Sequence, residues 1–352
     1  MSDYLEFYKN KKILISGGAG AIGSRLAGRL CEAGAGFVMV LDDLSSGYRW
    51  NLPPASNLMF VGGNILDEVK LKRVFSERPQ VVFHLAAFFA NQNSIDHPET
   101  DLLVNGMGTL RLLEYSQLAR AERFVYASSG CSIYGSSAPL PLREEFMSMD
   151  LSSPYQITKM LGELYCNFFF NHYDFPVVKT RFFNSYGPGE VPGQYRNVIP
   201  NFIFWALQGK PLPVTGTGEE TRDFTYVGDI VDGLLRAGFY EDAIGKEMNL
   251  ASGAETRIID LANMINRLTG NKAGVMFRER RKWDKKSRLL ASIDRAKTLI
   301  GYSPGTPFNE GIANTIDWFR LHWKEIAESA SFEPGMSSAV RGVGPGMPTT
   351  AG

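Results

Sequence analysis

The sequence predicts an α/β fold: a doubly wound parallel sheet with a smaller α+β C-terminal substrate lobe. In the first half of the 352 residues, short strands that are apolar throughout alternate with segments of helical spacing. After residue 181 this alternation stops, and stretches rich in glycine and proline separate further helices. Strands that are apolar on both faces are typical of a parallel sheet covered by helices on both sides. Right-handed crossovers then wind the chain into two layers.

The expected elements follow one another in a regular order. The expected strands are 12–16, 37–41, 58–61, 81–85, 123–127 and 177–181. The expected helices are 22–33, 69–76, 101–119 and 154–172, followed in the smaller lobe by 199–208, 257–269 and 309–326. The predicted domains are 1–185 plus 223–251 for the sheet, 186–222 plus 252–330 for the lobe, and 331–352 as a disordered tail of small and polar residues.

The overall charge is balanced, since lysine plus arginine and aspartate plus glutamate both number 37. Neither nucleic acid nor a membrane is therefore expected as a partner, and an anionic ligand must be held by a local cluster of cations. Cys31, Cys131 and Cys166 are too few and too scattered for a disulfide framework or a metal site. With no signal peptide or spanning segment in sight, we expect a cytoplasmic protein.

A glycine-rich segment follows the first strand and opens the first helix. Its glycines, Gly17, Gly20 and Gly23, permit a tight turn and a close approach of the backbone to a pyrophosphate at the helix N-terminus. Asp42 ends the next strand, where a carboxylate accepts hydrogen bonds from ribose hydroxyls and repels a 2′-phosphate. No lysine or arginine lies between Asp42 and Gly47, so NAD is favoured over NADP. The alternative is an ordinary glycine-rich turn, which this context disfavours.

Tyr155 and Lys159 lie four residues apart, on one face of a predicted helix. A lysine ammonium beside a phenol favours the phenolate, so we expect Lys159 to lower the pKa of Tyr155. A phenolate can take the proton of a substrate hydroxyl while the carbon gives hydride to nicotinamide. We also expect Lys159 to bind the nicotinamide ribose. The alternative is an exposed pair on a helix surface, which the preceding dinucleotide motif disfavours.

These motifs, with the segments 82–87, 126–135, 181–184 and 221–224, resemble the extended short-chain dehydrogenase/reductase family over residues 10–325. The resemblance is to its NAD-dependent nucleotide-sugar epimerases and dehydratases, which include UDP-glucose 4-epimerase-like enzymes, and it implies a Rossmann sheet. It implies that NAD is bound by Gly17, Gly20, Ala21, Ile22, Gly23, Asp42, Asp43, Leu44, Ser45, Ser46, Gly47, Asn64, Ile65, Leu85, Ala86, Ala87, Phe88, Asn105, Tyr155, Lys159 and Phe183. It implies that the nucleoside diphosphate of the substrate is held by Asn184, Asn197, Val198, Arg222, Arg281 and Asp284.

One position departs from the family pattern. Family members carry a serine or threonine four residues before the tyrosine of a Val-Tyr-Gly ending, where this chain has Gly130. Either Ser129 or Ser132 shifts into this place through a local bulge, or the hydrogen bond comes from elsewhere in the chain. We take Ser129 as the candidate catalytic residue beside Tyr155 and Lys159. Dehydratases and decarboxylases of the family have an acidic residue in the place of Ser132, so dehydration is disfavoured.

The favoured reaction is therefore 4-epimerisation of a UDP-hexose or UDP-hexuronate, through oxidation at C4 and return of hydride to the opposite face. The alternatives are a 4,6-dehydratase or a 4-oxidoreductase. A 3,5-epimerase that uses Cys131 is less favoured, because the family pairs that cysteine with a lysine where this chain has Val198. A uronate would need a cation near the sugar, and the sequence does not locate one. Helices 101–119 and 154–172 resemble the family's dimer interface, so we expect a homodimer.

Overall fold

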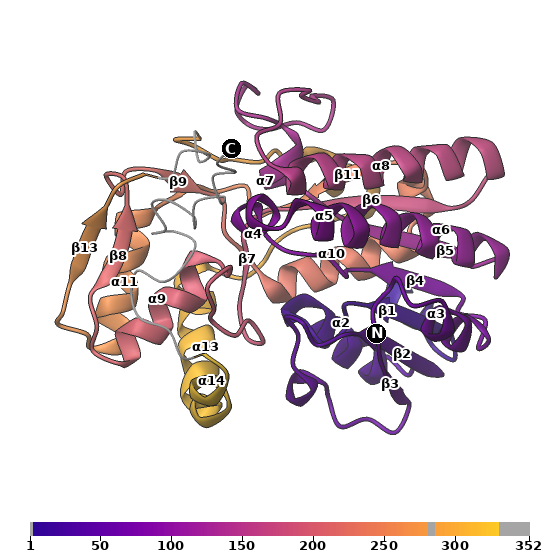
Figure 1. The fold of residues 1–352 in the computed structure, drawn as a ribbon, viewed down its shortest axis with the longest axis horizontal. Coiled ribbons are helices and arrows are strands. Elements are labelled where there is room, and N and C mark those ends of the chain that lie inside the picture. Colours follow the sequence, from indigo (N-terminus) through magenta and orange to yellow (C-terminus); the bar gives the residue numbers. More distant parts are fainter. Residues whose placement is uncertain (1–2, 281–285, 331–352) are drawn as a thin grey trace, which may run out of the picture.

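Seven parallel strands form the central sheet, in the order β11-β6-β5-β4-β1-β2-β3 (Figure 1). The protein is described by a computed structural model that covers residues 3–280 and 286–330. The strands are β1 (Lys12–Ser16), β2 (Phe37–Asp42), β3 (Leu58–Gly62), β4 (Val81–His84), β5 (Arg123–Ser129), β6 (Val177–Phe182) and β11 (Glu247–Leu250). The strand order reverses between β1 and β4, which leaves a crevice at their carboxyl ends. The predicted doubly wound sheet is confirmed.

Helices cover both faces of this sheet because the strand side chains alternate between two apolar clusters. Ile13 and Ile15 pack toward α2 (Ala21–Glu32), α10 (Val227–Phe239) and α12 (Asp294–Ile300). Leu14 packs on the other side, toward α3 (Glu68–Phe75), α6 (Gly108–Leu118) and α8 (Pro154–Tyr173). The remaining short elements of the sheet domain, on either face, are α1 (Asp3–Glu6), η1 (Arg49–Asn51), α4 (Asn91–Asp96), α5 (Pro98–Asp101), the π-helix η2 (Leu102–Met107), α7 (Gly130–Ile133) and η3 (Glu241–Ala243).

The smaller lobe lies at the left of Figure 1 and has its own apolar core, which includes Trp205, Leu261 and Phe319. Its strands pair in twos as β7 (Ser185–Tyr186) with β10 (Thr225–Tyr226), β9 (Thr221–Arg222) with β12 (Thr256–Arg257), and β8 (Leu212–Thr215) with β13 (Val275–Arg278). Its helices are α9 (Val198–Leu207), α11 (Ile258–Thr269), α13 (Phe308–Leu321) and α14 (Trp323–Ser329).

Two expected helices differ from the structure, and one strand of the sheet was not expected. The helix expected over 101–119 contains the π-helix η2, and the helix expected over 309–326 breaks at His322. The strand β11 was not expected, because Glu247 and Asn249 interrupt its apolar pattern. Residues 289–302, assigned to the smaller lobe, contribute Ala296, Ile300 and other apolar side chains to clusters of the sheet domain.

The domain boundaries otherwise stay a prediction, and the tail predicted over 331–352 lies outside the described residues. Within residues 3–280 and 286–330, no helix combines the length and the apolar character that crossing a bilayer requires.

Candidate active site

A cavity of about 550 Å³ lies between the carboxyl ends of the sheet strands and the smaller lobe. Its lining includes residues that follow β1, β2, β4 and β5, together with residues of the lobe between 184 and 224. This is the crevice in which doubly wound sheets bind their ligands. The cavity therefore brings the predicted cofactor motif and the predicted substrate residues to one place.

The glycine-rich turn between β1 and α2 permits backbone contacts that no other residue would allow. Gly17 has φ +73°, and a Cβ there would lie 2.5 Å from the backbone nitrogen of Ala86. A Cβ on Gly23 would lie 2.4 Å from the carbonyl oxygen of Gly17. Gly20 is the N-cap residue of α2. It has no side chain that could accept from the first N–H groups of the helix, so these groups are available to an anion.

Asp42 ends β2 and holds the glycine-rich turn by hydrogen bonds. Its Oδ2 accepts from the backbone N–H of Ala19 at 2.9 Å, and its Oδ1 accepts from that of Leu44 at 2.8 Å. Burial raises the pKa of this carboxyl group. Each carboxylate oxygen has a second lone pair, so both can still accept from ribose hydroxyls. Asn64, expected at the adenine edge, donates to Asp43 at 2.7 Å and accepts from the N–H of Leu66.

Most of the residues predicted to bind NAD line the cavity. They are Gly17, Gly20, Ala21, Ile22, Gly23, Asp42, Asp43, Ser45, Ser46, Gly47, Asn64, Ile65, Leu85, Ala86, Ala87, Phe88, Tyr155 and Lys159. Leu44, Asn105 and Phe183 do not line it, so their predicted contact with the cofactor finds no support there. The Asn105 side chain instead accepts from the backbone N–H of Phe88 at 2.8 Å, which positions a lining residue.

Tyr155 and Lys159 lie in the first turns of α8, which Ser153 caps by accepting from the N–H of Gln156. Both side chains line the cavity and are only 6% and 4% exposed. The Lys159 ammonium donates to the carbonyl of Ala127 at 2.9 Å and lies 5.7 Å from the centroid of the Tyr155 ring. The pair is therefore packed into the site, which excludes the alternative of an exposed helix pair.

The electrostatics of this pair differ from the expectation. Burial raises the pKa of Tyr155, and the nearby Asp101 carboxylate raises it further. Burial lowers the pKa of Lys159 to about 8, against the opposing effect of Asp101 and Glu163. The lowered pKa expected for Tyr155 is therefore not found in the chain by itself, where desolvation of the phenol is the largest effect on this pKa. An oxidised nicotinamide would bring positive charge to this site when bound.

A steric constraint explains why position 130 is a glycine. A Cβ on Gly130 would lie 1.9 Å from Cε2 of Phe183, whose ring is fully buried. A serine or threonine cannot stand there without displacing this ring. The Oγ atoms of Ser129 and Ser132 lie 2.9 Å apart, and both residues line the cavity. The Ser129 hydroxyl lies close enough to Tyr155 to lower the pKa of this phenol, against the larger effect of burial. This proximity supports Ser129 as the candidate for the missing hydroxyl.

A buried polar network behind the pair was not predicted. The Asp101 carboxylate accepts from the Thr158 hydroxyl at 2.8 Å and from the Asn105 amide at 2.7 Å. Thr158 directly precedes Lys159 on α8, and Asn105 lies in the π-helix η2. Asp101 is fully buried. No sequence signal separates it from an ordinary acidic residue of a helix, because its partners are 57 and 4 residues away.

The substrate side of the cavity contains Asn184, Asn197, Val198 and Arg222, as predicted. Asn197 and Val198 begin α9, so the positive end of this helix lies at the cavity, where an anion is favoured. Arg281 and Asp284 lie outside the described residues. Further lining residues that were not predicted from the sequence are Glu190, Tyr195, Arg196, Glu220, Arg280 and Lys286.

Carboxyl groups are confined to particular parts of the cavity lining. Among the residues that the structure describes, the lining carboxyl groups belong to Asp42, Asp43, Glu190 and Glu220. Asp42 ends β2, and Asp43 follows it. The Glu220 carboxylate lies 3.9 Å from the guanidinium of Arg280. Glu190 accepts from the Asn197 amide at 3.0 Å, and burial raises its pKa to about 7. No carboxyl group comes from α7, which carries Ser132.

Comparisons with known proteins identify the family. The chain matches the profile of the NAD dependent epimerase/dehydratase family over residues 13–251. It is 37% identical to the UDP-glucose 4-epimerase of Mycolicibacterium smegmatis, covering 88% of this chain and 98% of that protein.

Two solved structures are also similar. An epimerase of Methanothermobacter thermautotrophicus is 56% identical, with a TM-score of 0.93, and the match covers 94% of this chain and 98% of that one. The UDP-glucose 4-epimerase of Thermotoga maritima, solved with UDP-glucose, is 33% identical, with a TM-score of 0.84. This match covers 89% of this chain and 100% of that one. The predicted resemblance and the predicted use of NAD are confirmed: the chain belongs to the NAD-dependent epimerase/dehydratase family.

Proposed function

We propose that the protein is an NAD-dependent UDP-sugar 4-epimerase. The observation that carries the proposal is the meeting of Tyr155, Lys159 and Ser129 in one cavity with the glycine-rich turn, while α7 contributes no carboxyl group. A 4-epimerase needs one acid/base group at C4, whereas a dehydratase needs a second acid and base to remove water. The names of the M. smegmatis and T. maritima relatives support the same reaction.

In the proposed reaction the Tyr155 oxygen takes the proton of the C4 hydroxyl and later returns it. Ser129, whose hydroxyl lowers the pKa of Tyr155, is assigned to hold the reacting oxygen beside the phenol. Lys159, fixed by the carbonyl of Ala127, sets the charge beside Tyr155. NAD supplies the hydride acceptor and donor for C4. Return of the hydride to the opposite face would invert C4, and because the hydride is returned, NADH would not accumulate.

The keto sugar must turn within the cavity between the two hydride transfers. This requires a firm hold on the diphosphate and a loose hold on the ring. We assign the firm hold to Arg222 and to the N-terminus of α9, which begins at Val198. The segment 88–94, which we place beside the sugar, contributes Phe88, Phe89 and Asn91 to the lining. The Phe89 ring lies edge-on to that of Tyr155, with 5.9 Å between their centroids.

Incubation of the purified protein with UDP-, GDP-, CDP- and dTDP-sugars, followed by NMR, tests this function. We expect one pair of UDP-sugars to interconvert at C4 without stoichiometric NADH. Tyr155→Phe should lower kcat by about 10²- to 10⁴-fold, whereas Tyr173→Phe, at the exposed end of the same helix, should retain activity. Accumulation of a keto-deoxy sugar would instead identify a dehydratase, and stoichiometric NADH a 4-oxidoreductase.

The structure gives little support to the alternative that the protein is a 3,5-epimerase with Cys131 as its acid/base. Burial raises the pKa of the Cys131 thiol, which keeps it protonated and makes it a poor base. Val198 lines the cavity but cannot titrate. The three cysteines are free, consistent with the reducing cytoplasm in which we place the protein.

We further propose that the protein forms a homodimer through α8 and η2. These two elements pack against each other and expose several large apolar side chains, which are Leu102, Leu103, Met107, Ile157, Leu164 and Phe168. Such a patch is typical of a protein interface. Phe168→Glu should convert the dimer to a monomer in light scattering, whereas Phe277→Glu, on exposed β13 of the lobe, should not. A monomeric wild-type protein would contradict the proposal.

A further inference from the structure

A buried ion pair lies directly behind the reacting groups. Arg181 on β6 donates from Nε to Oε1 of Glu163 at 2.9 Å and from Nη2 to Oε2 at 2.7 Å, so the contact is bidentate. The two side chains are only 1% and 3% exposed. Glu163 lies on α8, one helical turn after Lys159. The pair therefore connects β6 to the helix that carries Tyr155 and Lys159.

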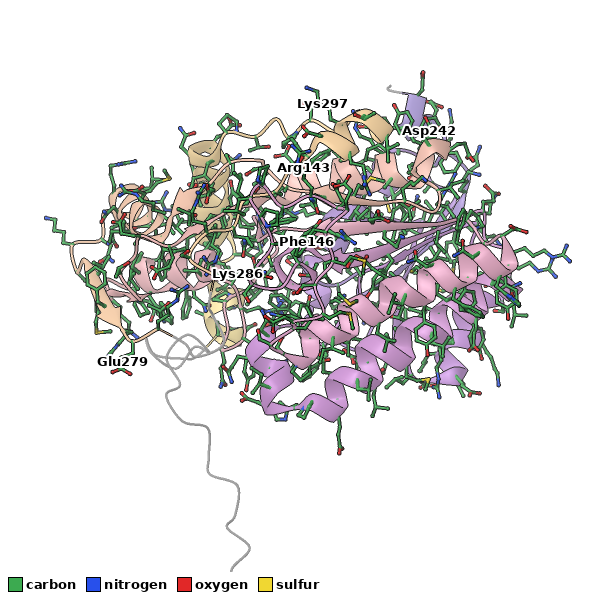
Figure 2. All side chains as sticks on the ribbon, turned by 90° about the horizontal axis from the view of Figure 1, so that it is seen from above. Arg143, Phe146, Asp242, Glu279, Lys286 and Lys297 are labelled. Carbon is green, nitrogen blue, oxygen red and sulfur yellow. The ribbon has the colours of Figure 1, made fainter. Side chains whose placement is uncertain are left out.

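The same carboxylate also holds the strand β5. Its Oε1 accepts from the Ser128 hydroxyl at 2.5 Å, and Ser128 directly precedes Ser129 at the end of β5. Figure 2 shows α8 as the long pink helix that runs alongside the strands of the sheet. Helix and strand approach closely, since a Cβ on Gly162 would lie 2.1 Å from the hydroxyl oxygen of Tyr126. Glu163 therefore fixes how α8 lies on β5.

Arg181 extends these contacts to α7. Its Nη1 donates to the hydroxyl of Tyr134 at 3.0 Å, and Tyr134 is the C-cap residue of α7. Two residues after Arg181, the ring of Phe183 packs where a side chain at Gly130, the first residue of α7, would stand. Directly or through Glu163, Arg181 thus contacts α8, β5 and the end of α7. Two of these elements carry the groups of the proposed reaction.

Stability alone does not explain an ion pair at this place. Taking two charges out of water is costly, and apolar side chains of the same volume would hold the elements together about as well. Hydrogen bonds between charged groups, in contrast, fix distances and angles closely. When a proton and a hydride must pass between bound groups, a displacement of about 1 Å can lower the rate by about 10²-fold.

We propose that the Arg181–Glu163 pair positions the reacting groups, by holding the acid/base pair on α8 at a fixed place relative to Ser129. The inference rests on the proposed function and adds positioning residues to it. Neither side chain of the ion pair lines the cavity, so its effect is exerted through Ser128 and through α8. Loss of the pair should therefore affect the chemical step rather than the binding of NAD or UDP-sugar.

The first test is Ser128→Ala, which leaves the ion pair whole and removes only its bond to β5. We expect kcat for C4 epimerisation to fall by roughly 3- to 10-fold, because the residue next to Ser129 loses its contact with α8. Glu163→Gln, which also leaves Arg181 without its charge partner, should lower kcat by roughly 10- to 100-fold. In both variants, KM for the UDP-sugar and the NAD content of the purified protein should stay within about twofold of the wild type.

A pH profile separates positioning from a purely structural role. Lys159 faces the carboxylates of Asp101 and Glu163, both of which raise its pKa, and His84 on β4, which burial keeps neutral. Glu163→Gln removes one of these charges. The limb of the kcat/KM profile that Lys159 sets, near its pKa of about 8, should then move to lower pH. Ser128→Ala leaves both charges and should leave this limb in place.

Glu247→Gln is the matched control. Glu247 on β11 forms the neighbouring ion pair of β6, with the buried ammonium of Lys179 at 3.0 Å, and Arg295 is a second partner. Neither Glu247 nor Lys179 lines the cavity. Like Glu163→Gln, this variant should lower the free energy of unfolding, because it leaves a buried cation without its carboxylate. It should leave kcat and the pH profile unchanged.

Two results would overturn the inference. If Ser128→Ala and Glu163→Gln lose stability but keep kcat, as expected for the control, the ion pair is only structural. If KM or NAD content changes as much as kcat, the pair shapes a binding site instead. Should Glu163→Gln fail to fold, Ser128→Ala still provides the kcat measurement, since it retains both charges.

A wild type that converts no UDP-sugar would be a failure of the proposed function and not of this inference. The pKa of Lys159, followed by NMR of ¹⁵N-labelled lysine side chains in the NAD-bound protein, is then the readout. We expect it to be lower in Glu163→Gln than in the wild type and unchanged in Glu247→Gln. Equal values in all three proteins would contradict an action of Glu163 on the site.

Discussion

The two ends of the cavity are built from different parts of the chain. At the NAD end the shape of the cavity depends on backbone atoms. Gly17 and Gly23 allow close approaches between backbone segments, and the backbone N–H groups of Ala19 and Leu44 donate to the Asp42 carboxylate. At the other end, next to the smaller lobe, the cavity is lined by long charged side chains, including Arg222 at the end of the short strand β9 and Lys286 in a loop.

This difference explains how one family can keep its cofactor and vary its substrates. A backbone turn tolerates few substitutions, because added atoms collide with other backbone atoms that cannot move away. A charged side chain in a loop can be exchanged with little effect on the fold. The comparison therefore predicts that changes at the two ends have separable effects on NAD and on UDP-sugar binding.

The largest effect is expected at the NAD end, from Gly23→Ala. The new Cβ would lie 2.4 Å from the carbonyl oxygen of Gly17, so we expect purified protein without NAD and a loss of about 1–3 kcal/mol in unfolding free energy. Extraction and chromatography of the bound nucleotide, with denaturant unfolding, would measure both.

Gly28→Ala is the matched control, because it changes the same helix where the nearest atom is 4.0 Å away. It should retain NAD and gain about 0.5–1 kcal/mol, as expected for alanine in a helix interior. Full NAD content in Gly23→Ala would show that this turn is not the pyrophosphate site.

At the substrate end, Arg222→Met should weaken UDP-sugar binding without loss of NAD. We expect KM and the inhibition constant of UDP to rise by roughly 10- to 100-fold, since a charged hydrogen-bond partner is removed. Arg257→Met is the control, on the paired strand β12, where the side chain is exposed and bonded to Asp260 and Glu219. Loss of NAD in Arg222→Met would break the proposed separation of the two ends.

Between the two ends, Ser129→Ala should lower kcat by roughly tenfold, the effect of one hydrogen bond to the reacting groups. Ser132→Ala should have a smaller effect, because it is the Ser129 hydroxyl that lowers the pKa of Tyr155. Single-turnover reduction of bound NAD would show whether the chemical step is the one affected. If Ser132→Ala is the more damaging change, the missing hydroxyl comes from Ser132.

The smallest expected effect is a shift in pH dependence from Asp101→Asn. The Asp101 carboxylate raises the pKa of both Tyr155 and Lys159. Its removal lowers both, so the two limbs of the pH profile that these groups set, the lower of them near the Lys159 pKa of about 8, should both move to lower pH.

A kcat/KM profile against pH would show this shift. Glu99→Gln, an exposed carboxyl group on the same helix α5, should leave the profile in place. A profile of Asp101→Asn that moves to higher pH would contradict the assigned interactions.

The sequence by itself determined the sheet, the glycine-rich turn, Asp42, and the pair Tyr155 and Lys159. Each of these depends on short-range geometry: a strand followed by a turn and a helix, a strand end, or one turn of a helix. In such motifs the chain spacing alone sets which atoms meet. The resemblance to a family added the substrate residues Asn184, Asn197 and Arg222, which also line the cavity.

Only the tertiary structure decided the features that join distant segments. The ring of Phe183 excludes a side chain at Gly130, and the Thr158 hydroxyl meets Asp101 across 57 positions. The ammonium of Lys286 reaches the carbonyl of Cys131 across 155 positions. No local pattern encodes these contacts, because they arise from the packing of elements whose separation in sequence is unrelated to their distance in space. The same packing desolvates Tyr155 and raises its pKa, the reverse of what its spacing from Lys159 had suggested.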